Sequence, residues 1–313
     1  MNVFTRLLSR RIDSYIHYRR SLGYVYESQA STLRAFTQFV RERADRGPLT
    51  QKLALAFVLP CDVTPNVRAR RYGVLRNFAE YLSVYDPRTE PFDPHALPRM
   101  RAVPPVRILD ERELSRLLEA ARECSRLHPI RGETLRTVIG LLASTGLRSG
   151  EALRLDRSDV DLERGILLIR QTKFRKDRLV PVHPTTRKEL GRYACARDAA
   201  YPAPTSPAFF LSLRGGRLCS HGFSAAFRQA SLKAGLHKGL PRGVRPHDLR
   251  HRFAVTRLVQ WHREGADVQA RLPVLATYLG HARYADTAYY VTGTPELLGL
   301  AAARAFGDEG SVS

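Results

Sequence analysis

A proline-rich stretch, residues 91–106, divides the chain into two parts. It holds five prolines and two arginines and lacks the apolar periodicity of a helix or a strand, which is typical of a linker. At 313 residues the chain is long enough for two packed cores. We therefore predict an N-terminal domain over residues 1–97, a linker over 98–109 and a second domain over 110–313.

The first part is predicted to be a small helical domain. Apolar side chains recur at helical spacing in residues 4–20, 31–46 and 67–85, and residues 51–58 fit a shorter helix. The polar faces of these helices carry six arginines: Arg19, Arg20, Arg34, Arg68, Arg70 and Arg71.

The second part mixes helices with a few short strands. Asp110 is expected to cap a helix, with Glu113 completing a capping box. The expected fold class is mainly α with a small antiparallel β-sheet (α+β). The further helices are expected over 135–144, from 149, and over 185–196, 221–234, 246–258, 268–279 and 295–306; the strands are expected over 160–162, 166–170 and 179–182, with another over 209–213.

The charge of the chain indicates a polyanionic partner. The net charge is +21, and residues 1–100 contain 16 basic against 9 acidic side chains, so both parts are basic. Two basic domains fit the gripping of one nucleic acid. Four scattered cysteines without a CxxC pair argue against a zinc site and fit a reducing cytoplasm. No apolar run approaches the ~20 residues that span a bilayer.

Two stretches each present an arginine at a helix. The sequence PHDLRH continues with apolar residues at helical spacing, so His247 and Arg250 share one face. The sequence STGLRSGE reads as a helix that ends at Gly146, followed by Arg148 in a turn. Guanidinium groups form forked hydrogen bonds with phosphate oxygens. Both arginines are therefore candidates for binding a phosphate.

Two further stretches carry a lysine and a tyrosine. In QTKFRKDRLVPV, two strand-like runs are joined by a basic turn that holds Lys173, and in LGHARYADTAYY, His281 precedes Tyr290 by nine residues. Metal-free cleavage of a phosphodiester needs cations on the non-bridging oxygens, a nucleophile and an acid for the leaving oxygen. The four stretches together contain candidates for each role.

In this order and spacing the four stretches resemble the tyrosine recombinase (phage integrase) family, from about residue 110 to the C-terminus. The resemblance implies an active site made of Arg148, Lys173, His247, Arg250, His281 and Tyr290, with Glu151 orienting Arg148 and with Arg175 and Lys176 contacting DNA. The first part resembles in pattern the helical domain with which this family covers one face of the DNA, which implies that the six arginines on its polar faces contact DNA as well.

The resemblance also implies how these groups act. Lys173 would protonate the leaving 5′-oxygen, His247 would take the proton of the tyrosine, and Tyr290 would attack to give a 3′-phosphotyrosine. Tyr289 is an adjacent rival. The glycines that usually flank the lysine are replaced by Thr172 and Phe174. No metal, cofactor or ATP is implied.

The biological role that the resemblance implies is site-specific recombination for a bacterial mobile element. The expected partners are double-stranded DNA recombination sites and further copies of the chain in a homo-tetramer, with no membrane involved. The expected location is the cytoplasm, at the nucleoid.

Three alternatives remain open from the sequence. His247, His251 and His281, aided by Asp248, have metal-ligand spacing, and Asp156, Asp159 and Asp161 could belong to a metal nuclease. A type IB topoisomerase would use similar chemistry without pairing sites. A DNA-binding relative that has lost catalysis would have the same charge and fold.

Overall fold

The computed structural model describes residues 3–60, 62–98, 107–125, 128–170, 177–237, 243–281 and residue 287. The chain divides into two compact units, Met1–Pro104 and Pro105–Ser313. Within the described ranges, no helix combines the length and the apolar character needed to cross a bilayer.

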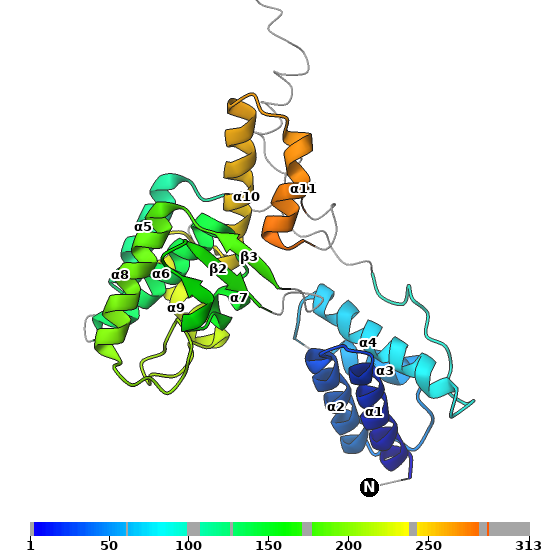
Figure 1. Ribbon diagram of the computed structural model, residues 1–313. Helices are drawn as coiled ribbons and strands as arrows, with labels where there is room; N and C mark the ends of the chain where they lie inside the picture. Colours follow the sequence, from blue (N-terminus) through cyan, green and yellow to red (C-terminus); the bar gives the residue numbers. More distant parts are fainter. Residues whose placement is uncertain are drawn as a thin grey trace, which may run out of the picture. The chain divides into compact units, whose positions relative to one another are not determined.

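The first unit is helical, as predicted. It contains α1 (Val3–Ser21), α2 (Glu27–Glu42), α3 (Gln51–Val58) and α4 (Pro65–Ser83), which pack around one apolar core (Figure 1). The Thr50 side chain caps α3 by accepting a hydrogen bond from the Leu53 N–H at 3.2 Å. Helix α2 begins four residues before the predicted start, because Tyr26 adopts a left-handed conformation with φ +53° and turns the chain there.

The second unit is built around α6 (Pro129–Thr145). Helices α5 (Glu111–Arg122), α8 (Pro184–Ala200) and α9 (Ser220–Lys233) pack against α6, and α7 (Ser149–Arg154) follows it after a short turn (Figure 1). The predicted capping box at α5 is confirmed: Asp110 accepts from the Glu113 N–H at 2.7 Å, and Glu113 accepts from the Asp110 N–H at 3.1 Å.

A small antiparallel sheet lies beside these helices in the order β1-β2-β3. Strands β1 (Val160–Asp161), β2 (Ile166–Ile169) and β3 (Arg178–Pro181) follow a short 3-10 turn, η1 (Arg157–Asp159). Ile169 at the end of β2 pairs with Arg178 at the start of β3. The predicted strand over 209–213 is wrong: within it only Leu211 forms a bridge, an isolated one with Arg217, and the Phe209 N–H donates to the Leu155 carbonyl, which belongs to no strand.

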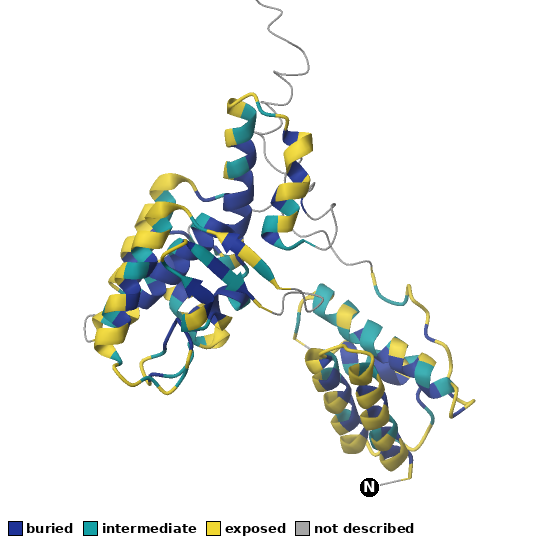
Figure 2. Ribbon diagram, in the orientation of Figure 1, coloured by how far each residue is buried: buried dark blue, intermediate teal, exposed yellow. Residues whose placement is uncertain are grey.

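Helices α10 (Pro246–Arg263) and α11 (Val268–Leu279) form a pair with a small apolar core of their own (Figure 1). Residues 248–255 of α10 are all buried, whereas its last turns are partly exposed (Figure 2). The left-handed Gly146 that ends α6 lies against this core, and a Cβ there would come within 2.6 Å of the Phe253 ring and 2.8 Å of the Leu279 side chain. The end of α6 is thereby held between α10 and α11.

Candidate active site

Glu151 is the centre of a network of charged hydrogen bonds. It occupies the first turn of α7, where its Oε2 accepts from the Arg148 backbone N–H at 3.0 Å. Its Oε1 accepts from Arg148 Nη1 at 2.9 Å, and Arg178 donates to both carboxylate oxygens at 3.1 and 2.9 Å. The Glu151 side chain is only 3% exposed, so its contact with Arg148 is not a surface ion pair.

The pKa of Glu151 reflects these contacts. Burial alone would raise it, but the hydrogen bonds and charge of Arg178, followed by those of Arg148, lower the pKa to about 2. Glu151 is therefore ionised at any pH at which the protein is expected to work.

Replacing Glu151 with glutamine is expected to remove a pH-dependent part of the stability. Because the pKa in the folded protein lies below the ordinary 4.5, the ionised carboxylate stabilises the fold above pH 4.5, and this contribution is lost as the pH falls toward 2. Its size is on the order of 3 kcal/mol. Urea unfolding at pH 7, 5, 4 and 3 should show a wild-type advantage over Glu151→Gln that shrinks below pH 4.5. An advantage that stays constant would contradict the prediction.

Arg178 is part of this site, although the sequence analysis did not select it. It opens β3, and its side chain is 12% exposed. Besides its two bonds to Glu151, its Nε donates to the Tyr278 carbonyl at 3.0 Å. The only sequence signal was its place at the end of a basic run, which does not distinguish it from its neighbours.

Arg250 lies beneath the network and is 1% exposed. Its Nη1 donates to the Gly146 carbonyl at 2.7 Å and its Nη2 to the Leu279 carbonyl at 2.8 Å. These carbonyls belong to the ends of α6 and α11, where the helix dipoles favour a cation. Arg148 reaches the same place, since its Nη2 donates to the Gly280 carbonyl at 3.1 Å. Both predicted phosphate-binding arginines thus hold the segment 279–280, which leads to His281.

His247 lies in the first turn of α10, one turn before His251, and the two rings meet edge to face with centroids 4.6 Å apart. Part of the His247 side chain is open to solvent, but neighbouring protein atoms desolvate the ring. This desolvation, followed by the charge of Arg250, lowers the pKa of His247. A lowered pKa keeps the imidazole neutral near pH 7, which is the form that can accept a proton.

His281 follows the left-handed Gly280 that ends α11. Its Nδ1 lies 2.6 Å from the Thr287 hydroxyl oxygen, and Thr287 is fully buried. This hydrogen bond fixes the orientation of the imidazole ring. Thr287 belongs to the stretch LGHARYADTAYY, but the sequence alone does not predict its contact with His281.

Four of the predicted site residues lie outside the described residues: Lys173, Arg175, Lys176 and Tyr290. The structure does describe the neighbours of both segments. Arg178 stands two residues after the basic turn and binds Glu151, while Thr287 stands three residues before Tyr290 and contacts His281.

The aspartates considered for a metal nuclease are engaged elsewhere. Asp156 pairs with Arg217, and Asp159 accepts from Arg170 Nε at 2.6 Å. The Asp161 carboxylate accepts backbone N–H groups of the turn that follows it, at 3.0 and 2.8 Å. Across the part of the chain that the structure describes, no group of three or more His, Cys, Asp or Glu side chains has an arrangement that could hold a metal ion.

The predicted DNA-contacting arginines of the first unit are spread over three helices. Arg20, Arg34 and Arg70 are exposed, and Arg68 and Arg71 are half-buried. The guanidinium carbon of Arg19 lies 4.4 Å from the centroid of the Tyr24 ring. On α4, Arg68 and Arg71 are three residues apart and share a face, whereas Arg70 lies off that face.

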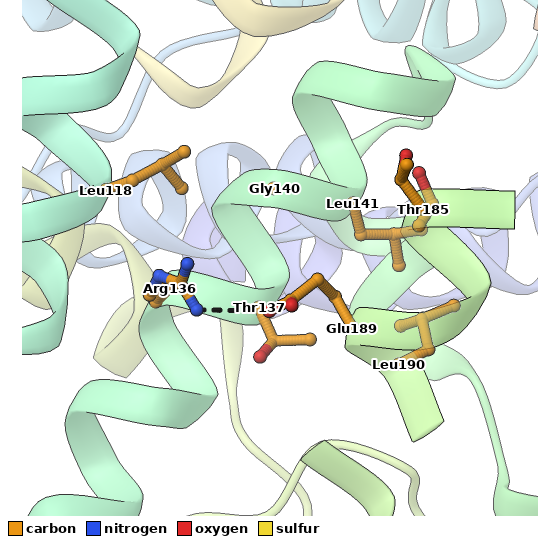
Figure 3. A pocket seen from close by; sticks show the side chains of 9 residues that line it. Leu118, Arg136, Thr137, Gly140, Leu141, Thr185, Glu189 and Leu190 are labelled. Atoms are coloured by element: carbon orange, nitrogen blue, oxygen red, sulfur yellow. Dashed lines mark hydrogen bonds and ion pairs between the residues drawn. The ribbon is translucent and has the colours of Figure 1, made fainter. Parts of the chain in front are cut away.

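A separate small pocket opens between α6 and α8. It is lined mainly by apolar groups such as Leu118, Leu141 and Leu190, and the ion pair of Arg136 with Glu189 at 3.1 Å crosses its edge (Figure 3). None of the predicted site residues lines it. This pocket therefore does not coincide with the predicted site.

Comparison with known proteins identifies the family. The model of the Phage integrase family matches residues 107–296. A protein named as an integrase/recombinase, y4rE, of Sinorhizobium fredii is 57% identical over 311 residues, 99% of this chain and 100% of that protein. The tyrosine recombinase XerD of Mycobacterium leprae is 37% identical over 168 residues, 52% of this chain and 49% of that protein.

Solved structures share the fold. The Tn1549 transposon integrase in complex with transposon right end DNA superposes with a TM-score of 0.68 at 16% identity, over 95% of this chain and 98% of that one. A lambda integrase dimer bound to a COC′ core site gives 0.60 at 19% identity, over 88% and 96%. The predicted fold class, mainly α with a small antiparallel sheet, is confirmed. The chain belongs to the phage integrase family of tyrosine recombinases and is a tyrosine-type site-specific recombinase.

Proposed function

We propose that the chain cuts and rejoins DNA through Tyr290, with Arg148, Lys173, His247, Arg250 and His281 as its catalytic partners. The observation that carries this assignment is the convergence of Arg148 and Arg250 on the segment 279–280 immediately before His281. Three stretches that are far apart in the sequence thus bring two guanidinium groups and a histidine to one place.

In the proposed reaction the Tyr290 oxygen attacks the scissile phosphorus, and His247 accepts the phenolic proton. The bond from phosphorus to the 5′-oxygen breaks, and Lys173 protonates that oxygen to leave a free 5′-hydroxyl. Arg148, Arg250 and His281 stabilise the charge on the non-bridging oxygens. A 5′-hydroxyl from another strand then attacks the 3′-phosphotyrosine, so the phosphate bond energy is conserved and no ATP is consumed.

The described residues that lie near Lys173 and Tyr290 in the sequence support the roles proposed for these two residues. Ile169 and Arg178, which flank the segment with Lys173 in the sequence, pair with each other, and Arg178 binds Glu151. The hydrogen bond between His281 and Thr287 leaves only two residues between the site and Tyr290. These neighbours in the sequence thus contact the proposed site, which supports both roles.

Double-stranded DNA is the proposed substrate. The net charge of +21 supports it, and so do the DNA-bound Tn1549 and lambda integrases with the same fold. Contacts from basic residues of both units would release counterions, so the affinity should fall steeply with salt. The likeness to the integrase/recombinase y4rE over the full length supports recombination over topoisomerase activity, and the Tn1549 transposon integrase with the same fold supports a role for a bacterial mobile element. With DNA as its substrate, the protein is proposed to act at the nucleoid.

We also propose that four copies act together on two paired DNA sites. Exchange between two duplexes requires four strand cleavages, and each copy carries one predicted nucleophile. The apolar residues Leu298 and Leu300, in the predicted C-terminal helix, lie outside the described residues and are the proposed contact between copies. Sedimentation of the DNA complex is expected to show a tetramer, and recombination by a monomer would contradict the proposal.

Covalent capture of a nicked suicide substrate tests the proposed function. The wild-type protein is expected to form a denaturant-resistant adduct in which the DNA 3′-phosphate is attached to protein and the 5′-hydroxyl is free. Sequencing the captured ends would identify the site that is cut. EDTA should leave the yield unchanged, whereas an adduct through the 5′ end, or cleavage that EDTA abolishes, would overturn the proposed chemistry.

A further inference from the structure

Arg178 connects the strand after the basic turn to the two other parts of the site. We propose that Arg178 is a positioning residue that neutralises Glu151 and holds the segment leading to His281, so that the charge of Arg148 remains available to the phosphate. This inference rests on the proposed function and adds to it a residue outside the set that we expect to touch DNA.

The hydrogen bonds of Arg178 point to positioning instead of phosphate binding. Its Nη1 and Nη2 form a fork on the Glu151 carboxylate at 3.1 and 2.9 Å, and its Nε binds the Tyr278 carbonyl at 3.0 Å. Both Nη atoms of Arg178 thus bind a carboxylate, which neutralises its charge, whereas the Nη atoms of Arg250 bind neutral backbone carbonyls at 2.7 and 2.8 Å, which do not neutralise the charge of Arg250. Its side chain is 12% exposed, against 33% for Arg148, so Arg148 is the more accessible cation.

The electrostatic consequence concerns Arg148. Glu151 Oε1 accepts from both Arg148 Nη1 and Arg178 Nη1. With Arg178 present, the single carboxylate is matched by a buried guanidinium, and Arg148 adds a net positive charge to the site. Without Arg178, the Glu151 carboxylate would neutralise the charge of Arg148. The attraction of Arg148 for the phosphate would then fall.

The steric consequence concerns the segment before His281. Gly280 has φ +68°, and a Cβ there would lie 2.7 Å from Arg178 Nη1. The Gly280 backbone therefore rests directly on the Arg178 guanidinium, while its carbonyl accepts from Arg148. Loss of Arg178 would remove both its contact with the Gly280 backbone and its hydrogen bond to the Tyr278 carbonyl, two residues earlier.

The test measures the single-turnover rate of covalent capture with saturating full-length protein from pH 5 to 8. Arg178→Gln is expected to lower the rate at pH 7.5 by about 10- to 100-fold, as changes to groups that orient an active site commonly do. DNA affinity should stay within about threefold, because Arg178 is not expected to touch DNA. Arg170→Gln is the matched control. Arg170 directly follows β2 and forms an ion pair with the buried Asp159, so this change removes a similar ion pair and leaves Glu151 unchanged.

The pH profile distinguishes positioning from a general loss of stability. Two arginines face Glu151: Arg148, in the turn before α7, and Arg178, on β3. The nearby groups that titrate are His247 on α10 and His281 after α11. Removing Arg178 should raise the pKa of the buried carboxyl, so that Arg178→Gln loses further rate as the pH falls toward 5. The histidines are common to all variants, and the extra acid loss should vanish in Arg178→Gln combined with Glu151→Gln.

Arg178→Lys is a second test variant. It takes the place of Arg178→Gln if circular dichroism shows that Arg178→Gln is unfolded. Lysine keeps the charge but not the fork, so we expect a rate loss of about tenfold without the acid loss. Full rates and parallel pH profiles for a folded Arg178 variant would overturn the role of Arg178 alone. A wild-type protein that forms no adduct would instead overturn the proposed function.

Discussion

Replacing Tyr290 with phenylalanine is expected to abolish covalent capture of a nicked DNA substrate. The change removes one hydroxyl and almost no volume, so folding and DNA binding should survive. Without the hydroxyl, no phosphotyrosine bond can form, and the adduct yield should fall to background on a denaturing gel. This is the largest single effect that we predict.

Tyr289→Phe is the matched control, because it makes the same change at the adjacent position. It should retain the adduct, since the family resemblance assigns the nucleophile to Tyr290, nine residues after His281. An adduct in Tyr290→Phe that resists denaturant would show that the nucleophile is elsewhere. Loss of the adduct in Tyr289→Phe alone would move the assignment by one residue.

Much of the fold could be predicted because local signals agreed with tertiary packing. The bounds of α3 and α11 match the prediction, since Pro60 follows the former closely and Gly280 ends the latter. The capping box at Asp110 was predictable because both of its partners lie within four residues. By contrast, the segment 209–213 has the composition of a strand but forms none. A strand needs a neighbouring strand to pair with, and the composition of a segment does not show whether such a neighbour is present.

The candidate site was predictable in its residue types but not in its connections. Four basic residues fall within 173–178, and only the pairing of Ile169 with Arg178 decides that the last of them faces Glu151. The Thr287 contact depends on how the chain turns after α11, which no periodicity reveals. Nor does the sequence show that Arg250 is buried, because its partners stand 104 and 29 residues away.

The burial of Arg250 changes what its replacement is expected to do. Arg148→Ala and Arg250→Ala should each remove transition-state stabilisation on the order of 3 kcal/mol, a loss in cleavage rate of roughly a hundredfold or more. Arg148 is partly exposed, and its partner Glu151 keeps Arg178 when Arg148 is removed, so Arg148→Ala should fold with nearly wild-type stability.

Arg250→Ala should lose stability as well as activity. It leaves the Gly146 and Leu279 carbonyls without the guanidinium that binds them at 2.7 and 2.8 Å, and it opens a cavity between α6 and α11. Unsatisfied buried carbonyls cost about 1–3 kcal/mol each, so we expect a total of roughly 2–6 kcal/mol. For a unit of this size the melting temperature should fall by roughly 5–15 °C.

Calorimetry of the two variants, paired with single-turnover capture at a temperature where both are folded, separates these effects. Arg148→Ala is expected to lose rate without a large change in melting temperature, and Arg250→Ala to lose both. Equal melting temperatures for Arg250→Ala and the wild type would contradict the structural role of the guanidinium at the two helix ends. A wild-type rate in folded Arg148→Ala would remove that arginine from the group that binds the phosphate.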